Sequence, residues 1–331
     1  MKNTLVTLFT VCSFVTVTAH DWSTARPDGH APIGVMGDHT HGKGEWMASY
    51  RYMTMAMEGN RSGTSNISTA SVLAGWPVAP LEMTMEMHML GVMYAPIEKL
   101  TLTAMLPFSF VSMDHITRTG VRFTTETHGV GDIQLGGLYE LGRWDQHGVH
   151  LNFGFGLPTG SVDERDATPA GANSLLPYPM QLGSGTVDFL PGLTYLGQSE
   201  DWSWGSQLRG TVRLGDNEED YSLGDRLGAS GWLARKICSM ARVSGRLSLD
   251  TWGNIDGAES RVNPMMVPTA DTGRRGGTRL DLLFGLNLYR SSGFLKGHRL
   301  AIEGGIPVYQ RLDGPQLETD WLLTAGWQYA W

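Results

Sequence analysis

Hydrophobic and polar residues alternate with a period of two over most of this chain. The last stretch shows the pattern most clearly, because an apolar and aromatic set occupies every second position: Trp321, Leu323, Ala325, Trp327, Tyr329 and Trp331. A period of two predicts a β-strand with one apolar face. That face needs a large apolar partner, and a lipid bilayer with aromatic side chains at its interfaces provides one. The closing strand of a soluble sandwich or barrel is the alternative.

The same alternation recurs about twelve times along the chain, an even number typical of single-chain bacterial barrels. The connections between the segments alternate short and long, and the long ones include residues 112–129 and 253–277. A soluble barrel has no reason to sort its connections in this way. We therefore predict an all-β fold: a transmembrane antiparallel β-barrel over residues 45–331, with short periplasmic turns and long extracellular loops.

The start of the chain has the features of an export signal. Met1 and Lys2 precede an apolar run over residues 5–17, and small residues follow up to Ala19. This run is too short to span a bilayer, so we interpret residues 1–19 as a secretory signal peptide. Residues 20–44 are irregular and carry four histidines among glycines and prolines. They are either a periplasmic lead-in or a plug of the lumen.

Composition and motifs exclude several classes of protein. The formal net charge of −8 argues against nucleic acid as a partner. No Gly-x-Ser-x-Gly, Cys-x-x-Cys or His-Glu-x-x-His motif occurs, so we predict that the protein is not an enzyme. An outer-membrane hydrolase would be the alternative if Asp114, His115 and His128 met at the outer rim of the barrel.

Charged residues recur on the strand faces opposite the apolar ones. Arginine is costly against lipid, so these faces should point inward. The predicted lumen-lining residues are Arg209, Arg213, Arg242, Arg246, Asp250 and Asp281. Two interpretations stay open: a ring of charge that sets selectivity, as in porins, or charge pairs that brace the lumen.

Methionines gather on two neighbouring predicted strands. Seven of them are candidate metal ligands: Met53, Met55, Met57, Met83, Met85, Met87 and Met89. Soft thioether sulfur selects Cu(I), and His39 or His41 could assist. The alternative is that methionine serves as a flexible apolar lining. Strand alternation points His88 away from this set.

Three segments carry a resemblance to a known family: HAPIGVMGDHTHGKGEWMASYRYM, LPYPMQLGSGTVDFLPGLTYLG and LDGPQLETDWLLTAGWQYAW. They resemble proteobacterial outer-membrane proteins described as transporters and related to the proteins of the meta-pathway of phenol degradation. The resemblance covers nearly all of the chain after residue 19. It implies an outer-membrane barrel that passes small aromatic or apolar solutes, and it supplies no functional residues.

These observations predict a channel or transporter for small solutes in the outer membrane of a Gram-negative cell. A copper-handling barrel that binds Cu(I) through its methionines is the first alternative, and the hydrolase is the second. The predicted partners are the solute, outer-membrane lipid and lipopolysaccharide. The barrel-assembly machinery is a further expected partner, because the C-terminal aromatic strand resembles the signal by which outer-membrane barrels are assembled.

Overall fold

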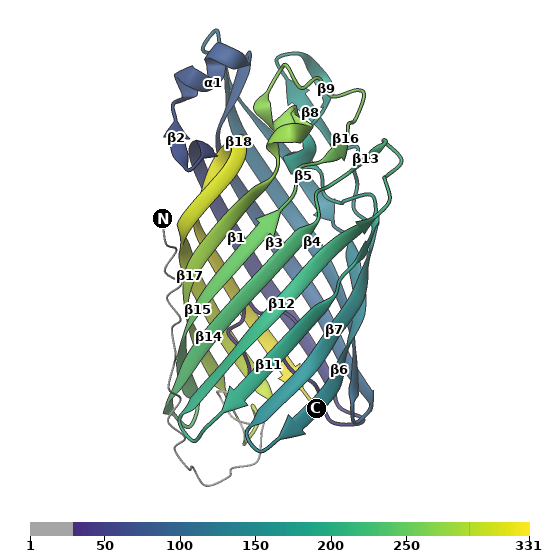
Figure 1. The fold of residues 1–331 in the computed structure, drawn as a ribbon, viewed down its shortest axis with the longest axis vertical. Coiled ribbons are helices and arrows are strands. Elements are labelled where there is room, and N and C mark those ends of the chain that lie inside the picture. The colour runs from purple at the N-terminus through teal and green to yellow at the C-terminus, as the bar shows by residue number, and fades with distance from the viewer. Residues whose placement is uncertain (1–28, 291) are drawn as a thin grey trace, which may run out of the picture.

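A computed structural model describes residues 29–290 and 292–331. The predicted signal peptide, residues 1–19, and the first part of the lead-in lie outside the described residues. The remaining chain forms a tall barrel of tilted strands (Figure 1). All neighbouring strands of the wall are antiparallel, as the sequence predicts.

Twelve passes of the chain form the wall. In chain order they are β1 (Trp46–Gly63), β3 (Val78–Ile97), β4 (Leu100–Thr117), β5 with β6 (Arg122–Val130, Ile133–Trp144), β7 (His147–Leu157), β10 with β11 (Val187–Phe189, Gly192–Gln198), β12 (Trp202–Leu214), β14 (Arg226–Cys238), β15 (Ala241–Trp252), β17 (Gly277–Tyr289) and the two halves of β18 (His298–Ala330). β5 and β6 count as one pass because both pair with β4, and β10 and β11 because both pair with β7 and β12.

The last element, β18, is 33 residues long and crosses the barrel twice. Its first half pairs with β17, and its second half pairs with β1. The two halves also bond to each other. Trp327 Nε1 donates to His298 Nδ1 at 3.0 Å, and near the other end Thr319 N donates to Gln310 Oε1 at 2.9 Å. β18 is therefore a hairpin.

The first and last passes close the barrel. The backbone N–H of Trp46 donates to the carbonyl of Trp331 at 3.0 Å, and the N–H of Trp331 donates back at 2.9 Å. β12 also pairs with β14, so the described strands form a complete ring. A closed ring satisfies each strand from both sides and leaves no strand edge to lipid.

Most connections sort by length, as predicted, and the short link between β4 and β5 (118–121) is an exception. Five short ones lie at the end of the barrel that carries the C-terminus (Figure 1). The opposite end carries the longer connections and their small elements: β2 (Ser65–Ile67), α1 (Thr69–Gly75), β8 (Arg165–Thr168), β9 (Gly171–Leu175), η1 (Tyr178–Met180), β13 (Tyr221–Ser222), β16 (Asp256–Gly257), η2 (Pro268–Ala270) and η3 (Thr272–Arg274).

One predicted loop is wrong. Residues 112–129 are mostly strand, because β4 and β5 pair from Phe108 with Val130 to Ile116 with Arg122. Their outer positions are polar, with Asp114 opposite Thr124, so the sequence has no apolar face to reveal them. Such a pattern fits strands that extend beyond the hydrocarbon layer, where the outer face meets water.

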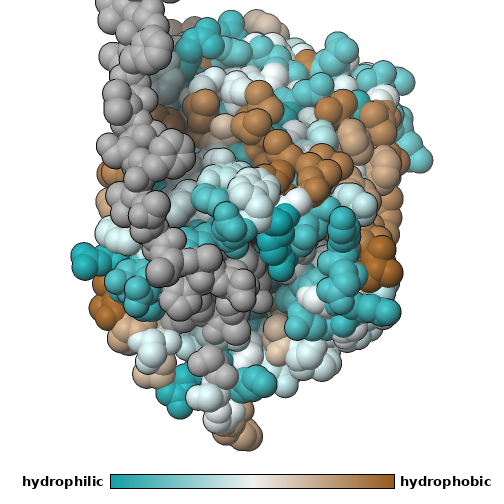
Figure 2. All heavy atoms as spheres, turned by 60° about the horizontal axis from the view of Figure 1, so that its bottom comes forward, coloured by the Kyte–Doolittle hydropathy of each residue, from teal (hydrophilic) through white to brown (hydrophobic). Residues whose placement is uncertain are grey.

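The outer surface of the wall is apolar. Large side chains from six elements point outward with substantial exposure: Leu90, Leu106, Leu208, Leu247, Phe284 and Ile306. Figure 2 shows apolar patches on the flank of the molecule and mainly hydrophilic residues at the end that faces the viewer. Among the described residues, no helix has the length and apolar character needed to cross a membrane. These outward-pointing apolar side chains form the kind of outer surface that is expected of a barrel in lipid.

Cysteine labelling tests which end faces outward. In a Cys238→Ser background, we expect Ser65→Cys, Ala170→Cys and Met265→Cys to react with a membrane-impermeant maleimide on intact cells. All three lie at the long-loop end. Ser199→Cys lies in a short turn at the other end and should react only after the cells are broken. The opposite labelling pattern would invert the topology.

Candidate functional site

The lumen holds two cavities of similar size. The first, of about 440 Å³, is lined by Met36 and Gly37 of the segment before β1. The second, of about 450 Å³, lies toward the long loops and is lined by Tyr178 and Thr269 of those loops. We call them the lower and upper cavities. Arg209, Arg226 and Asp250 line both, so these residues mark the boundary between the two.

The predicted methionines form one wall of both cavities. β1 and β3 pair as a hairpin, with Met53 opposite Met87, Met55 opposite Met85 and Met57 opposite Met83. Met53, Met87 and Met89 line the lower cavity, and the other four line the upper one. We call these seven residues the methionine wall. His88 points outward, as predicted, and its Nδ1 lies 2.8 Å from the hydroxyl of Tyr50.

Part of the methionine wall already has partners. Met83 packs with Leu176 and Met180 of the loop between β7 and β10. The sulfur of Met55 accepts a hydrogen bond from Arg279 Nη1 at 3.3 Å. These contacts suit an apolar lining. A guanidinium on the sulfur of Met55 opposes a metal cation at that position.

The opposite wall carries the predicted charges, and most of them are paired. Arg209 Nη2 lies 2.7 Å from Asp250, and Arg213 contacts Asp188. Arg246 donates two hydrogen bonds to Glu303, at 2.9 and 2.8 Å. Asp281 accepts from Arg279 at 3.0 Å, and buried Arg242 donates to Ser203 at 3.3 Å. These contacts agree with the interpretation that charge pairs brace the lumen.

Two guanidiniums in the upper cavity lack a carboxylate partner. Arg226 forms no ion pair with any residue that the structure describes, and it lies over the ring of Trp252 at 5.5 Å. Arg275 leaves Nη1 buried with no hydrogen-bond partner. Neither residue is among the predicted lumen-lining residues. Arg226 begins a strand with weak alternation, and Arg275 lies in a loop. The sequence pattern therefore does not indicate that either side chain points into the lumen.

Residues 29–45 cross the lumen below the lower cavity. Side chains from several strands bind the backbone of this lumen segment: Asn152 donates to the Gly37 carbonyl at 2.8 Å, Gln207 to that of Met36 at 2.8 Å, and Arg299 to that of Ala31. Gly37 has φ +59° and a β-carbon there would meet the amide of Asn152, so only glycine fits without strain.

Histidines of the lumen segment are shielded from water. Burial lowers the pKa of His30 well below its usual value, and it lowers that of His41 to about 3. Burial acts this way because it penalises the charged imidazolium. Both rings are therefore neutral at physiological pH.

The long loops cover the upper cavity. Tyr178, Tyr221 and Ile255 come from three different loops and pack together. Hydrogen bonds from Arg261 lower the pKa of Glu259 to about 2, so this carboxylate stays ionised and holds the loop that contains it. The two cavities are thus covered at one end by loops and at the other by the lumen segment.

The residues proposed for a hydrolase do not meet. His115 is buried inside the wall and stacks on Phe123. Asp114, its neighbour in the strand, points outward and accepts a hydrogen bond from Thr124 at 2.6 Å. His128 lies opposite Phe110, on the outer face as well. Strand alternation separates these side chains, so they form no catalytic set.

The fold belongs to the class of outer-membrane β-barrels. A scan against protein-family models and a search of curated proteins both find no match. Among solved structures, the chain is similar to an outer-membrane channel from Pseudomonas putida F1, with 13% identity and a TM-score of 0.64 over 90% of this chain and 100% of that one. That likeness confirms the predicted fold class, and the apolar outer surface of the wall agrees with the predicted outer-membrane location.

Two further solved structures are more distant. A FadL homologue of Pseudomonas aeruginosa shows 11% identity and a TM-score of 0.40, and the coverage is 94% of each chain. A mutant of the monoaromatic hydrocarbon channel TodX shows 11% identity and a TM-score of 0.44, over 88% of this chain and 91% of that one.

The pair of Arg246 and Glu303 provides a test of the lumen wall. Both side chains are buried, so Glu303→Gln should leave a guanidinium without its counter-charge inside the barrel. Breaking a buried pair from one side typically costs about 3–5 kcal/mol. We expect a loss of this size in the free energy of unfolding, measured by urea titration in lipid vesicles.

Arg311→Gln is the matched control. Its pair with Asp313 is 3.4 Å long and more than half exposed on the arginine side, so its loss should cost at most about 1 kcal/mol. Equal losses in the two variants would contradict the assignment of Arg246 and Glu303 as a buried brace.

Proposed function

We propose that the protein is an outer-membrane channel for small aromatic or apolar solutes, with a preference for those that carry a carboxylate. One observation carries this proposal: four residues of the methionine wall line the upper cavity together with two guanidiniums that form no ion pair with any described residue. Methionine side chains are apolar, adaptable and polarisable, and they make favourable contacts with aromatic rings. Such a wall accepts the ring or chain of a solute without selecting one shape.

The guanidiniums supply the second half of the proposed selectivity. Arg226 and Arg275 line the upper cavity and have no carboxylate partner among the described residues. A guanidinium can donate two parallel hydrogen bonds to the carboxylate of a solute. An ammonium or a hydroxyl group on the solute cannot accept two such bonds. A solute with a ring at one end and a carboxylate at the other would satisfy both walls.

This proposal agrees with the expectation drawn from the meta-pathway proteins of phenol degradation, and membership of that group stays a prediction. The contacts with lipopolysaccharide and with the barrel-assembly machinery stay predictions as well.

Uptake into vesicles tests the solute class. We expect proteoliposomes to take up benzoate faster than benzylammonium, which has a similar size and the opposite charge. The double variant Arg226→Gln, Arg275→Gln should slow benzoate at least about tenfold, because a charge-assisted hydrogen bond contributes about 1.5–3 kcal/mol and 1.4 kcal/mol is a factor of ten. Uptake of uncharged benzyl alcohol should be unchanged.

Arg311→Gln serves as the control for these rates, since Arg311 lines neither cavity. Equal uptake rates for benzoate and benzylammonium would contradict the proposed preference for a carboxylate. The proposed channel function would be contradicted if none of the three compounds entered proteoliposomes faster than vesicles without protein.

The register of the methionine wall favours a second function, Cu(I) handling. Cross-strand partners lie about 4.5–5.5 Å apart, close enough for two or three thioethers to reach one ion. Arg279 at the sulfur of Met55 weighs against it. The apolar lining is therefore the better supported role.

Leucine substitutions separate these roles. The variant Met53→Leu, Met55→Leu, Met85→Leu, Met87→Leu keeps volume and apolar character and removes four sulfurs. We expect it to retain benzoate uptake. Copper binding under reducing conditions, measured by competition with a Cu(I) chelator, should be the same as in the unmodified protein. A loss of copper binding in the variant would establish the copper function.

A further inference from the structure

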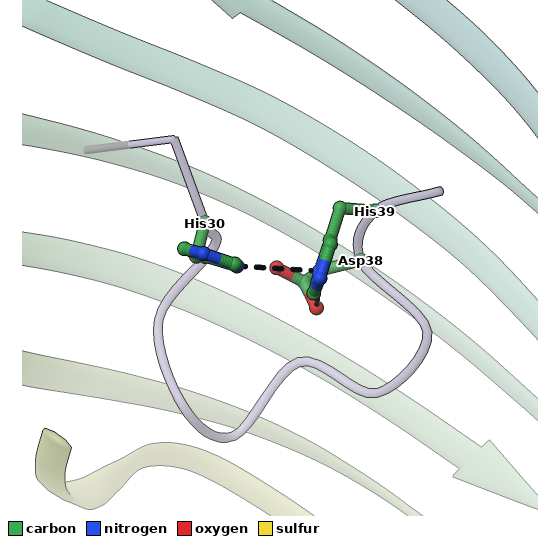
Figure 3. Close-up of side chains that lie close together, drawn as sticks. All are labelled: His30, Asp38 and His39. Carbon is green, nitrogen blue, oxygen red and sulfur yellow. Dashed lines mark hydrogen bonds and ion pairs between the residues drawn. The ribbon is translucent and has the colours of Figure 1, made fainter. Parts of the chain in front are cut away.

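Three buried side chains of the lumen segment converge on one point. His30 comes from one arm of this loop, and Asp38 and His39 come from the other (Figure 3). His30 Nδ1 lies 3.3 Å from His39 Nδ1, and His39 Nδ1 lies 2.9 Å from Asp38 Oδ1. One ligand atom from each residue lies within 4.8 Å of the other two.

Protons alone do not satisfy this arrangement. His39 Nδ1 carries at most one proton, and two acceptor-bearing groups face it. If the N–H at His39 Nδ1 donates to Asp38, it cannot also donate a full hydrogen bond to Nδ1 of His30. His39 Nε2 is also buried and has no hydrogen-bond partner. An ion pair between Asp38 and His39 therefore leaves Nδ1 of His30 without a hydrogen atom to accept.

A metal ion explains the spacing of the two ring nitrogens. In a tetrahedral site with metal–nitrogen bonds of about 2.0–2.1 Å, two ligand nitrogens lie about 3.3–3.4 Å apart. The two Nδ1 atoms lie 3.3 Å apart. Two imidazoles and one carboxylate are the donors that Zn(II) and Cu(II) accept, whereas Ca(II) and Mg(II) prefer sites made of oxygen alone.

The surroundings hold the carboxylate in place. Asp38 Oδ2, the oxygen that faces away from His39, accepts a hydrogen bond from the backbone N–H of Ala31 at 2.8 Å. This bond ties the two arms of the loop together and fixes the orientation of the carboxylate, as outer partners do in metal sites. His41 lies beside the group, with its ring 4.8 Å from that of His39 and its Nε2 buried without a partner.

Two arginines limit which ions can bind. The buried guanidiniums of Arg51 and Arg299 lie close enough to Asp38 to interact with its charge. They offset part of the negative potential, so a site that relied on charge alone would be weak. Coordination by imidazole nitrogen is less dependent on net charge, and this favours a transition metal.

We propose that His30, Asp38 and His39 form a site for a divalent transition-metal ion of the Zn(II) or Cu(II) class. The bound ion would join the two arms of the lumen segment and fix it across the lumen. This site differs from the one suggested by the sequence, in which His39 or His41 assisted the methionine sulfurs with Cu(I). It depends on neither the solute nor the channel activity.

Calorimetric titration of the full chain with Zn(II) tests the site. All proteins would carry His20→Ser, which removes a histidine that lies outside the described residues, and no histidine tag. We expect one ion to bind per chain. His30→Asn and His39→Asn should each weaken binding by more than about tenfold, the loss typical of disturbed metal sites. His128→Asn, on the outer face of the wall, should bind like the parent.

Copper spectroscopy on the parent protein keeps the test independent of how the variants fold. Cu(II) bound at this site should show nitrogen hyperfine coupling from two imidazoles in its electron paramagnetic resonance spectrum. The proposal is overturned by unchanged Zn(II) affinity in both His30→Asn and His39→Asn, by an absence of saturable binding in the parent, or by a spectrum with oxygen ligands alone.

Discussion

The structure depends on hydrogen bonding of the backbone in a medium without water. Each amide within hydrocarbon must bond inside the protein, and an open sheet would leave one row of amides unpaired at each edge. The pairing of β1 with β18 removes both edges at once, and the mutual bonds of Trp46 and Trp331 close its lower end. Closing the sheet into a ring also requires the strands to tilt, as they do in Figure 1.

Closure also divides the side chains into two populations. Outward positions must be apolar over the height of the lipid, and inward positions are then free to be polar. The lumen uses that freedom unevenly: β1 and β3 carry the methionine wall, and β12 to β18 carry arginines and carboxylates. Pairs such as Arg246 with Glu303 satisfy most of these charges inside the wall. Arg226 and Arg275 form no ion pair with any residue that the structure describes.

The alternation of apolar and polar residues predicts those features that depend only on the local sequence, such as a strand and its two faces. It predicted the strands and placed the methionines of β1 and of β3 on one face of each strand, because alternation alone fixes which side chains share a face. It misplaced residues 112–129, where polar residues lie on the outer face of strands that extend beyond the lipid.

Contacts between distant parts of the chain could not be predicted. Glu303 as the partner of Arg246 depends on how three strands lie next to each other. The convergence of His30 with Asp38 and His39 depends on how the lumen segment turns at Gly37. The sequence placed these histidines in an irregular segment and left open whether it entered the barrel.

We propose that a solute pathway runs through the barrel and that the lumen segment covers its lower end. Conductance of the purified protein in planar bilayers tests it most directly, with the full chain compared with a form that lacks residues 20–44. Both forms must first show heat-modifiable folding. We expect small, infrequent openings for the full chain and a several-fold larger steady conductance for the shortened form. Equal conductance of the two forms would contradict it.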